Sequence, residues 1–235
     1  MKALSIHPTP DAVAYAAAEW LITALQRPGP VAVALSGGST PKRLYEMLAQ
    51  APFRGQVPWE RTHWFVGDER FVPPEDEQSN VGMIRRAMLD HVPAPPTHIH
   101  PIPTVGLTPA DAAARYEAEL QAFHNTGLDT PLFDAVLLGL GPDGHTASLF
   151  PGSTALDNRA DWATAVTRPG GLPGVTCTYP ALESCRHAAF LVAGADKRDI
   201  LARVQAGDDL PAARYRPQGA LAWFVDQAAA PEEHA

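Results

Sequence analysis

Short apolar runs recur along the chain and predict buried β-strands. Val31–Leu35, Thr62–Val66 and the longer run Phe133–Gly139 have the apolar character of strands that are covered inside a sheet. Glycine or polar turn residues follow each run, which marks the end of the strand. Further strands are expected at His98–Ile102, Val175–Tyr179, Ala188–Ala193 and Leu221–Val225.

Helical periodicity occurs between these runs, and several helices have a recognisable start. Thr9-Pro10-Asp11 supplies a cap, a proline at the first helical position and an acid in the first turn. The apolar stripe that follows ends before Pro28, and Thr108-Pro-Ala-Asp111 begins a similar helix that runs to about His124. Helices are also expected after Ser36–Pro41, after Ser79-Asn80 and from about Asp196 to Gln205.

The alternation of strands and helices determines the expected fold. Strands that are connected through helices need crossover connections, which place neighbouring strands in parallel. We therefore expect an α/β protein with a doubly wound, mostly parallel sheet, helices on both faces and a single domain over residues 1–235. In such a sheet, ligands bind beyond the carboxyl ends of the strands, where the strand order reverses. Side chains that directly follow a predicted strand are therefore candidates for one site.

The strongest candidate is the turn that follows Phe133–Gly139. Three glycines break the strand abruptly and let the backbone approach a ligand, while Asp143 and His145 place an acid and a base on one turn. We interpret this turn as the mouth of an active site. The alternative is that Asp143 only caps a helix over Thr146–Phe150 and that His145 is an ordinary polar loop residue.

A second candidate is the glycine loop Ser36-Gly-Gly-Ser-Thr-Pro41, which follows the first predicted strand. The amides of Gly37 and Gly38, the hydroxyls of Ser39 and Thr40 and the start of a helix all favour an anion such as phosphate. The spacing matches neither the nucleotide-binding P-loop nor the Gly-x-Gly-x-x-Gly motif, which lowers the support for ATP or NAD. The alternative is an ordinary capped start of a helix.

Charged side chains follow two more predicted strands. The polar loop Gly67-Asp-Glu-Arg70 places Asp68 and Glu69 beside Arg70, which suits proton transfer near a cation or a bidentate phosphate contact from Arg70. The alternative is a solvated charged turn. Lys197 stands near the start of an expected helix, where a lysine opposes the helix dipole and gains nothing structurally.

Composition and charge exclude several classes of function. The chain has 18 basic and 26 acidic residues and a formal net charge of −8, and no basic run resembles a nucleic-acid footprint. No stretch reaches the roughly 18 apolar residues of a membrane span. We therefore expect neither a nucleic acid nor a membrane as partner.

The first residues and the two cysteines predict a cytoplasmic location. Met1–Asp11 lacks the layout of a signal peptide, and Cys177 and Cys185 form neither a metal-type pair nor a disulfide framework. His98-Ile-His100 has a spacing that could ligate a metal, but no acidic or cysteine partner is recognisable, so it is interpreted as a strand end.

Taken in order, these motifs resemble the 6-phosphogluconolactonase family. The resemblance extends from Leu35 to Phe224 and rests on Ala34–Pro41, Trp64–Arg70 with Ser79-Asn80, Leu138–Pro151, and Gly194 with Lys197. A related branch, the glucosamine-6-phosphate isomerases or deaminases, shares the glycine loop, the Asp-Gly-His turn and a lysine.

The chain departs from that related branch at two places. The branch has a glutamate of a ring-opening relay a few residues after its histidine, where this chain has Ser148-Leu149-Phe150. It typically has Asp-Glu-Tyr where this chain has Asp68-Glu69-Arg70. Hydrolysis of a lactone needs no such relay, so the lactonase is favoured. The alternatives are the isomerase or deaminase and a non-catalytic sugar-phosphate sensor, which is usually fused to a DNA-binding segment.

The resemblance implies an enzyme that hydrolyses 6-phospho-D-glucono-1,5-lactone in the oxidative pentose phosphate pathway. It implies that His145 is the general base, while Asp143 orients the ring, holds the turn or binds a substrate hydroxyl. It implies no metal or other cofactor, and we expect a monomer rather than a large oligomer. The implied residues of the substrate and phosphate site are Gly37, Gly38, Ser39, Thr40, Asp68, Arg70 and Lys197.

One departure from the family pattern concerns Gly174. Family members commonly carry an arginine at this point, just before a strand, so a phosphate contact is missing here. Arg168, Arg70 or Lys42 could replace it, or the affinity for substrate could be weaker. The sequence leaves these alternatives open.

Overall fold

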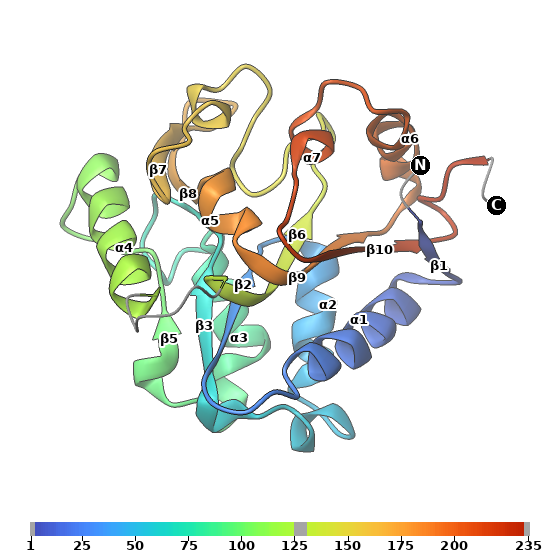
Figure 1. Ribbon diagram of the computed structural model, residues 1–235, viewed down its shortest axis with the longest axis horizontal. Helices are drawn as coiled ribbons and strands as arrows, with labels where there is room; N and C mark the ends of the chain where they lie inside the picture. Colours follow the sequence, from blue (N-terminus) through green and yellow to red (C-terminus); the bar gives the residue numbers. More distant parts are fainter. Residues whose placement is uncertain (1–2, 125–130, 233–235) are drawn as a thin grey trace.

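The strands form two sheets in the computed structural model, which describes residues 3–124 and 131–232 (Figure 1). Within these residues, a sheet of seven parallel strands has the order β1 (Ser5–His7), β10 (Ala220–Asp226), β9 (Cys185–Val192), β6 (Phe133–Gly139), β2 (Val31–Leu35), β3 (Thr62–Val66) and β5 (Ile99–His100). A smaller antiparallel sheet in the same part of the chain has the order β4 (Asp68–Arg70), β8 (Pro173–Cys177) and β7 (Ala163–Thr167). Met1 and Lys2, from the segment without a signal-peptide layout, lie outside the described residues.

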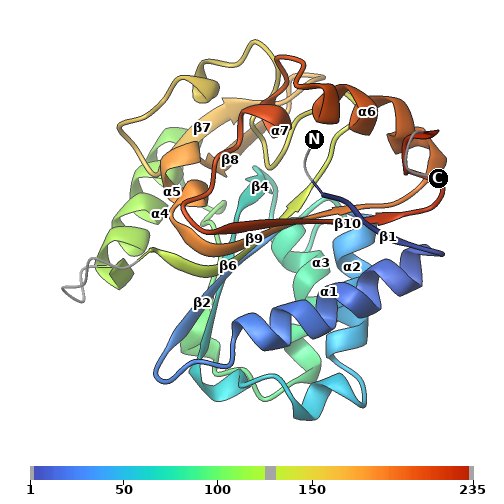
Figure 2. The ribbon, with the colours of Figure 1, turned by 45° about the vertical axis from the view of Figure 1, so that its right-hand side comes forward.

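Helices cover both faces of the main sheet (Figures 1 and 2). One face packs against α1 (Pro10–Ala24), α2 (Ser39–Leu48) and α3 (Asn80–Ala87). The other face packs against the smaller sheet and α4 (Pro109–His124), α5 (Tyr179–Glu183), α6 (Arg198–Ala206) and α7 (Pro211–Arg214). Short 3₁₀ turns are η1 (Phe53–Gly55), η2 (Trp59–Arg61), η3 (Leu89–His91), η4 (Pro96–His98), η5 (Thr154–Leu156) and η6 (Ala195–Lys197). None of the helices in the described ranges has the length and apolarity needed to cross a bilayer.

The apolar strands divide their side chains between two core clusters. In β2, Val31, Val33 and Leu35 pack toward α1–α3, whereas Ala32 and Ala34 pack on the opposite face. Successive side chains of a strand point to opposite faces, so a strand covered on both sides must be apolar throughout. This explains why the central strands read as continuous apolar runs in the sequence.

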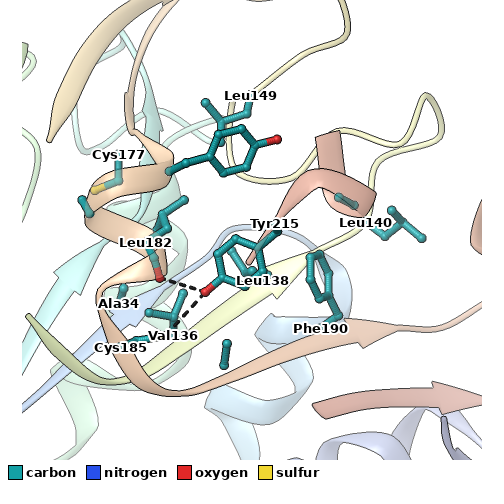
Figure 3. Packing of buried hydrophobic residues seen from close by; sticks show 14 of the residues in the cluster. Ala34, Val136, Leu138, Leu140, Leu149, Cys177, Leu182, Cys185, Phe190 and Tyr215 are labelled. Atoms are coloured by element: carbon teal, nitrogen blue, oxygen red, sulfur yellow. Dashed lines mark hydrogen bonds between the residues drawn. The ribbon is translucent and has the colours of Figure 1, made fainter. Parts of the chain in front are cut away.

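The core cluster on the side of α4–α7 contains a buried tyrosine whose hydroxyl group bonds a backbone carbonyl (Figure 3). Tyr215 packs edge-on against Phe190 and donates a hydrogen bond of 2.8 Å to the carbonyl oxygen of Leu182. Its hydroxyl also lies 3.5 Å from the sulfur of Cys185. The aromatic ring is buried because its polar end finds partners inside the core.

The expected fold class is confirmed. The main sheet is parallel throughout, helices lie on both faces, and β2, β3 and β6 have the predicted bounds. Thr9 caps α1, with its side chain accepting a bond of 3.2 Å from the amide of Ala12. The expected helix from Thr108 to about His124 is α4. These elements depend on local patterns, which is why the sequence predicts them.

The smaller sheet corrects two predictions. Asp68–Arg70 was expected in a loop but forms β4, because it pairs with β8 through contacts such as Asp68 with Thr176. The strand expected at Val175–Tyr179 is Pro173–Cys177, because Tyr179 begins α5. Neither β7 nor β1 was predicted. β1 pairs with β10, which is remote in sequence, whereas β7 pairs with the next strand, β8, in a hairpin.

The His98-Ile-His100 motif belongs to a cluster of imidazole rings at the β3–β5 edge. The ring of His63 stacks on His98 at 3.9 Å between centroids, and its Nδ1 lies 3.0 Å from Nε2 of His100. Nδ1 of His100 lies 2.6 Å from Oε1 of Glu119 on α4. Among the described residues, no three His, Cys, Asp or Glu side chains are arranged to hold a metal ion. Burial, reinforced by His98 and His100, lowers the pKa of His63 from 6.5 to about 4.

This shift predicts a loss of stability in mild acid. Between pH 6.5 and about 4, the unfolded chain binds a proton at His63 that the folded chain does not bind, so stability falls as the pH falls through this window. After allowance for solvent screening, we expect about 1–2 kcal/mol from this residue. His63→Phe should flatten the decline in unfolding free energy between pH 7 and pH 5, measured by urea denaturation. His91→Phe, at an exposed position, is the control, and equal declines in the wild type and His63→Phe would contradict the assignment.

Candidate active site

A cavity of about 240 Å³ lies at the carboxyl ends of β2, β3, β6 and β9. The strand order reverses between β2 and β6, because the chain continues from β2 to β3 and β5 on one side and from β6 to β9 and β10 on the other. This is the place where an open α/β sheet binds ligands. The cavity lining includes these residues predicted from the sequence: Gly37, Gly38, Ser39, Thr40, Asp68, Arg70, His145 and Lys197.

Asp143 lies behind His145 and contacts it directly. Oδ1 of Asp143 is 2.5 Å from Nδ1 of His145 and also accepts the backbone amide of His145 at 3.1 Å. Partial burial raises the pKa of Asp143, but the bonds from His145 outweigh this effect and hold it below its usual value. An ionised carboxylate only accepts hydrogen bonds, so the ring proton lies on Nδ1. Nε2 is therefore the nitrogen left with a lone pair for a ligand.

Glycine is required at one position of this turn because the imidazole ring packs against the backbone. A Cβ atom at Gly141 would lie 2.0 Å from Nδ1 of His145. The imidazole ring also contacts Phe150, with 4.6 Å between the ring centroids. The imidazole is thus fixed by a carboxylate, a glycine backbone and an aromatic ring.

The helix considered over Thr146–Phe150 is absent from the structure. The amide of Leu149 donates to the carbonyl oxygen of Thr146 at 3.0 Å, and Ala147 between them has a φ of 48°. This tight turn directs Ser148 toward the small sheet instead of starting a helix. The alternative role of Asp143 as a helix cap is therefore wrong.

The glycine loop after β2 presents the N-terminus of α2 to the cavity. Gly38 precedes the helix with a φ of 106°, a conformation that favours glycine, and it offers no side chain to cap the first amides. Gly37 packs tightly on Asn80, since a Cβ atom would lie 2.0 Å from Oδ1 of Asn80. Tyr45 holds the start of the loop by bonding both the amide and the carbonyl of Ser36. The uncapped helix end can bind an anion.

Asp68 and Glu69 point in different directions and have different roles. Asp68 lines the cavity, whereas Glu69 is buried against the start of α3. Glu69 accepts hydrogen bonds from the amides of Asn80 at 2.6 Å and Val81 at 2.8 Å, and from the hydroxyl of Ser79 at 3.1 Å. Burial raises its pKa above the usual value. Glu69 therefore supports the frame of the site and does not face the ligand space.

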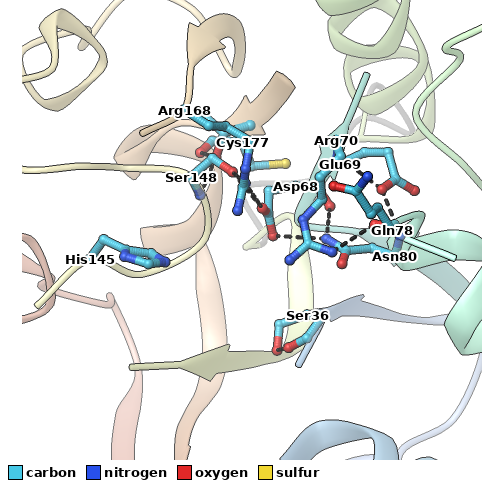
Figure 4. A network of polar contacts seen from close by, with 12 residues as sticks. Ser36, Asp68, Glu69, Arg70, Gln78, Asn80, His145, Ser148, Arg168 and Cys177 are labelled. Carbon is cyan, nitrogen blue, oxygen red and sulfur yellow. Dashed lines mark hydrogen bonds and ion pairs between the residues drawn. The ribbon is translucent and has the colours of Figure 1, made fainter. Parts of the chain in front are cut away.

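The structure places Arg168, one of the three cations considered for the contact missing at Gly174, in the cavity wall and joins it to Asp68 and buried Ser148. Oδ2 of Asp68 accepts a hydrogen bond of 2.5 Å from Ser148 and one of 3.3 Å from Nη1 of Arg168 (Figure 4). Nη1 of Arg168 also bonds Oγ of Ser148. Arg168 lines the cavity although it lies in a glycine- and proline-rich segment. That segment carries no local pattern that would indicate a buried ion pair.

Lys197 lines the cavity from η6, which follows β9. Its ammonium group lies 3.4 Å from the exposed carboxylate of Asp196. The loop before it is held by buried Asp226, whose two carboxylate oxygens each lie 3.1 Å from the amide of Gly194. The cavity thus combines the imidazole of His145 with cations at Arg70, Arg168 and Lys197. Such a set can bind a phosphorylated ligand and move a proton.

The sequence and the fold match known proteins over most of their length. The model of the family "Glucosamine-6-phosphate isomerases/6-phosphogluconolactonase" matches residues 8–223. A 6-phosphogluconolactonase of Nostoc sp. is 46% identical over 217 residues, covering 90% of this chain and 88% of the relative. One from Synechocystis sp. is 44% identical over 211 residues, covering 88% and 86%. The crystal structure of 6-phosphogluconolactonase from Thermotoga maritima is 31% identical, with a TM-score of 0.82, and 96% of this chain and 98% of that chain are covered.

The supporting role assigned to Glu69 can be tested by Glu69→Gln. The amide nitrogen of glutamine would face backbone donors, so at least one buried hydrogen bond is lost. We expect the free energy of unfolding to fall by about 1–3 kcal/mol in urea denaturation. Glu60→Gln, at an exposed position, is the matched control and should change it by less than about 0.5 kcal/mol. Equal stability of the two variants would show that α3 does not depend on this carboxylate.

Proposed function

The chain belongs to the glucosamine-6-phosphate isomerase/6-phosphogluconolactonase family, and from this premise we propose that it hydrolyses 6-phospho-D-glucono-1,5-lactone to 6-phosphogluconate. This enzyme activity belongs to the oxidative pentose phosphate pathway. The observation that carries the proposal is the pairing of His145 with Asp143 at the edge of a cavity that also contains an uncapped helix end and cationic side chains.

Phe150 favours the lactonase over the isomerase branch of the family. It occupies the position at which the resemblance to the isomerases requires a relay glutamate, and its buried ring packs against His145. Ring opening of an amino sugar needs a proton relay there, and a phenyl ring cannot supply one. Lactone hydrolysis needs only an activated water.

His145 is the proposed general base. Nε2 takes a proton from water while the water oxygen bonds to the lactone carbonyl carbon, and the carbonyl electron pair moves to its oxygen. The amides of the glycine turns stabilise this oxyanion. When the intermediate collapses, the bond from the carbonyl carbon to the ring oxygen breaks, and the imidazolium returns the proton to that oxygen. Asp143 stabilises the imidazolium in between, and the route uses no metal or other cofactor.

The remaining cavity residues bind the substrate in this proposal. The phosphate lies against the loop Gly37, Gly38, Ser39 and Thr40 and near Arg70 and Lys197. Asp68 is itself an anion, so it is suited to a substrate hydroxyl rather than to the phosphate. Binding energy from the phosphate positions the distant lactone carbonyl for attack.

We further propose a cytoplasmic location and a monomeric state. Cys177 and Cys185 are both free and buried, which suits a reducing compartment. In the described part of the chain, the large apolar side chains with high exposure are Tyr15 and Val105. Two isolated apolar residues do not form the contiguous patch that a stable subunit interface needs.

A coupled assay tests the proposed activity and the role of His145. The lactone is generated in situ, and its disappearance is compared with the spontaneous rate, while release of ammonia from glucosamine 6-phosphate is measured in parallel. We expect acceleration of lactone loss only, and His145→Asn should lower kcat by about a hundredfold or more while sparing ligand binding. His91→Asn, at an exposed position, is the control. Lactone loss at the spontaneous rate would refute the activity, and a near-normal kcat in His145→Asn would reassign the base.

The phosphate role of Lys197 is tested by Lys197→Ala. Removing an ammonium from a charge-assisted contact should weaken binding of 6-phosphogluconate by about tenfold or more in calorimetric titration. Lys42→Ala is the matched control, because Lys42 lies outside the cavity lining and pairs with Glu46 on the surface. Unchanged affinity in Lys197→Ala would remove Lys197 from the phosphate site.

A further inference from the structure

Arg168 is held in the cavity wall by three separate contacts. Its Nη1 bonds Asp68 and Ser148, and its guanidinium lies 5.2 Å from the centroid of the Phe150 ring. The side chain of Arg168 is only 15% exposed, and that of Asp68 is 7% exposed. These partners come from β4 and from the turn after β6, so two distant segments fix the orientation of one guanidinium (Figure 4).

Most of the hydrogen-bonding capacity of this guanidinium is unused. An arginine carries five N–H donors in a fixed planar arrangement. Within the described residues, Nη1 makes the hydrogen bonds to protein, while Nε and Nη2 have no protein partner. Burial lowers the pKa of Arg168, so the fold keeps a cation where its charge is unfavourable. A buried cation with free donors at a cavity is a candidate ligand-binding group.

The charges around Arg168 favour the binding of an anion. Arg70 is close enough to Arg168 to disfavour its charge, so the two guanidinium groups repel each other. Asp68 is the carboxylate that contacts Arg168, whereas the oxygens of Glu69 are bonded to the start of α3. On this wall, the cavity-facing carboxylate of Asp68 is paired with Arg168, while Arg70 bonds the carbonyl oxygen of Gln78, so an anionic ligand would relieve the repulsion between the two arginines.

The backbone beside Arg168 makes space for its side chain. Gly174 pairs with Val166 across the β7–β8 hairpin. A Cβ atom at Gly174 would lie 2.8 Å from the carbonyl oxygen of Glu69 and 3.4 Å from Cδ of Arg168. A larger residue at position 174 would therefore collide with the backbone of β4 and press on the stem of Arg168.

We propose that Arg168 binds the phosphate group of the substrate with Nε and Nη2, beside Arg70. Asp68, Ser148 and Phe150 are the groups that hold its guanidinium in the binding orientation. This inference rests on the proposed function, since it concerns the same phosphorylated substrate. Arg168, Arg70 and Lys42 are the cations that could replace the phosphate contact missing at Gly174. Lys42 lies on the surface and Arg70 belongs to the implied phosphate site in any case, so the replacement is assigned to Arg168.

The test compares ligands with and without phosphate. Binding of 6-phosphogluconate, inorganic phosphate and gluconate is measured by calorimetric titration for the wild type, Arg168→Gln and Arg168→Lys. We expect Arg168→Gln to weaken binding of both phosphate-containing ligands by about 30-fold and to leave gluconate binding unchanged. Arg168→Lys should lose less, because it keeps the charge but not the planar donor pair.

Arg159→Gln is the matched control. Arg159 also pairs with a carboxylate, Glu183, and stacks over an aromatic ring, Tyr179, but it lies outside the cavity lining. Its substitution should leave all three affinities unchanged. Equal weakening of gluconate and 6-phosphogluconate in Arg168→Gln would show a purely structural role and overturn the inference, as would unchanged phosphate affinity.

Folding and activity are measured separately. If thermal unfolding shows that Arg168→Gln is unfolded, the affinity of Arg168→Lys for 6-phosphogluconate becomes the test. An affinity equal to that of the wild type would overturn the inference. Because titration needs no turnover, failure of lactone hydrolysis with Arg168-dependent phosphate binding would reject only the proposed function. Normal hydrolysis with Arg168-independent binding would reject only the inference.

Discussion

Strands β2 and β6 pair in parallel at the centre of the main sheet, through Val33 with Ala135 and Ala34 with Val136. After β2 the chain continues to one side of the sheet, and after β6 it continues to the other side. The connecting helices therefore leave a crevice open at the carboxyl ends of these two strands. The glycine loop of one strand and the turn of Asp143 and His145 of the other meet at that crevice. The pairing of β2 with β6 therefore determines where the cavity lies, and the other segments contribute side chains to its wall.

The small antiparallel sheet gives the cavity its charged wall. Asp68 and Glu69 are neighbours on β4, and successive side chains of a strand point to opposite sides. One carboxylate consequently faces the ligand space and the ion pair with Arg168, while the other binds the first amides of α3. The two carboxylates therefore have different roles. The alternation of side chains along β4 places them on opposite sides of the strand, and burial and hydrogen bonding determine what each one contacts.

The overall charge of the protein and the charge of the site have opposite signs. The formal net charge is −8, yet Arg70, Arg168 and Lys197 line one cavity of about 240 Å³. A phosphorylated ligand is therefore attracted by the cavity and not by the protein surface as a whole. Partial burial strengthens this local field, because charges near low-dielectric protein are less screened than charges in water.

The sequence alone determined the elements with local signals: the parallel α/β class, the bounds of β2, β3 and β6, and the segments that carry His145 and the glycine loop. Apolar periodicity, caps and glycine turns extend over a few residues, so they can be read without a structure. Only the tertiary structure decided that Asp143 bonds His145 and that Ser148 and Arg168 join Asp68. The two contacts of Asp68 connect residues 80 and 100 positions apart, through the register of a sheet that no local pattern indicates. Asp143 and His145 are only two positions apart, but the conformation of their turn decides whether the two side chains meet.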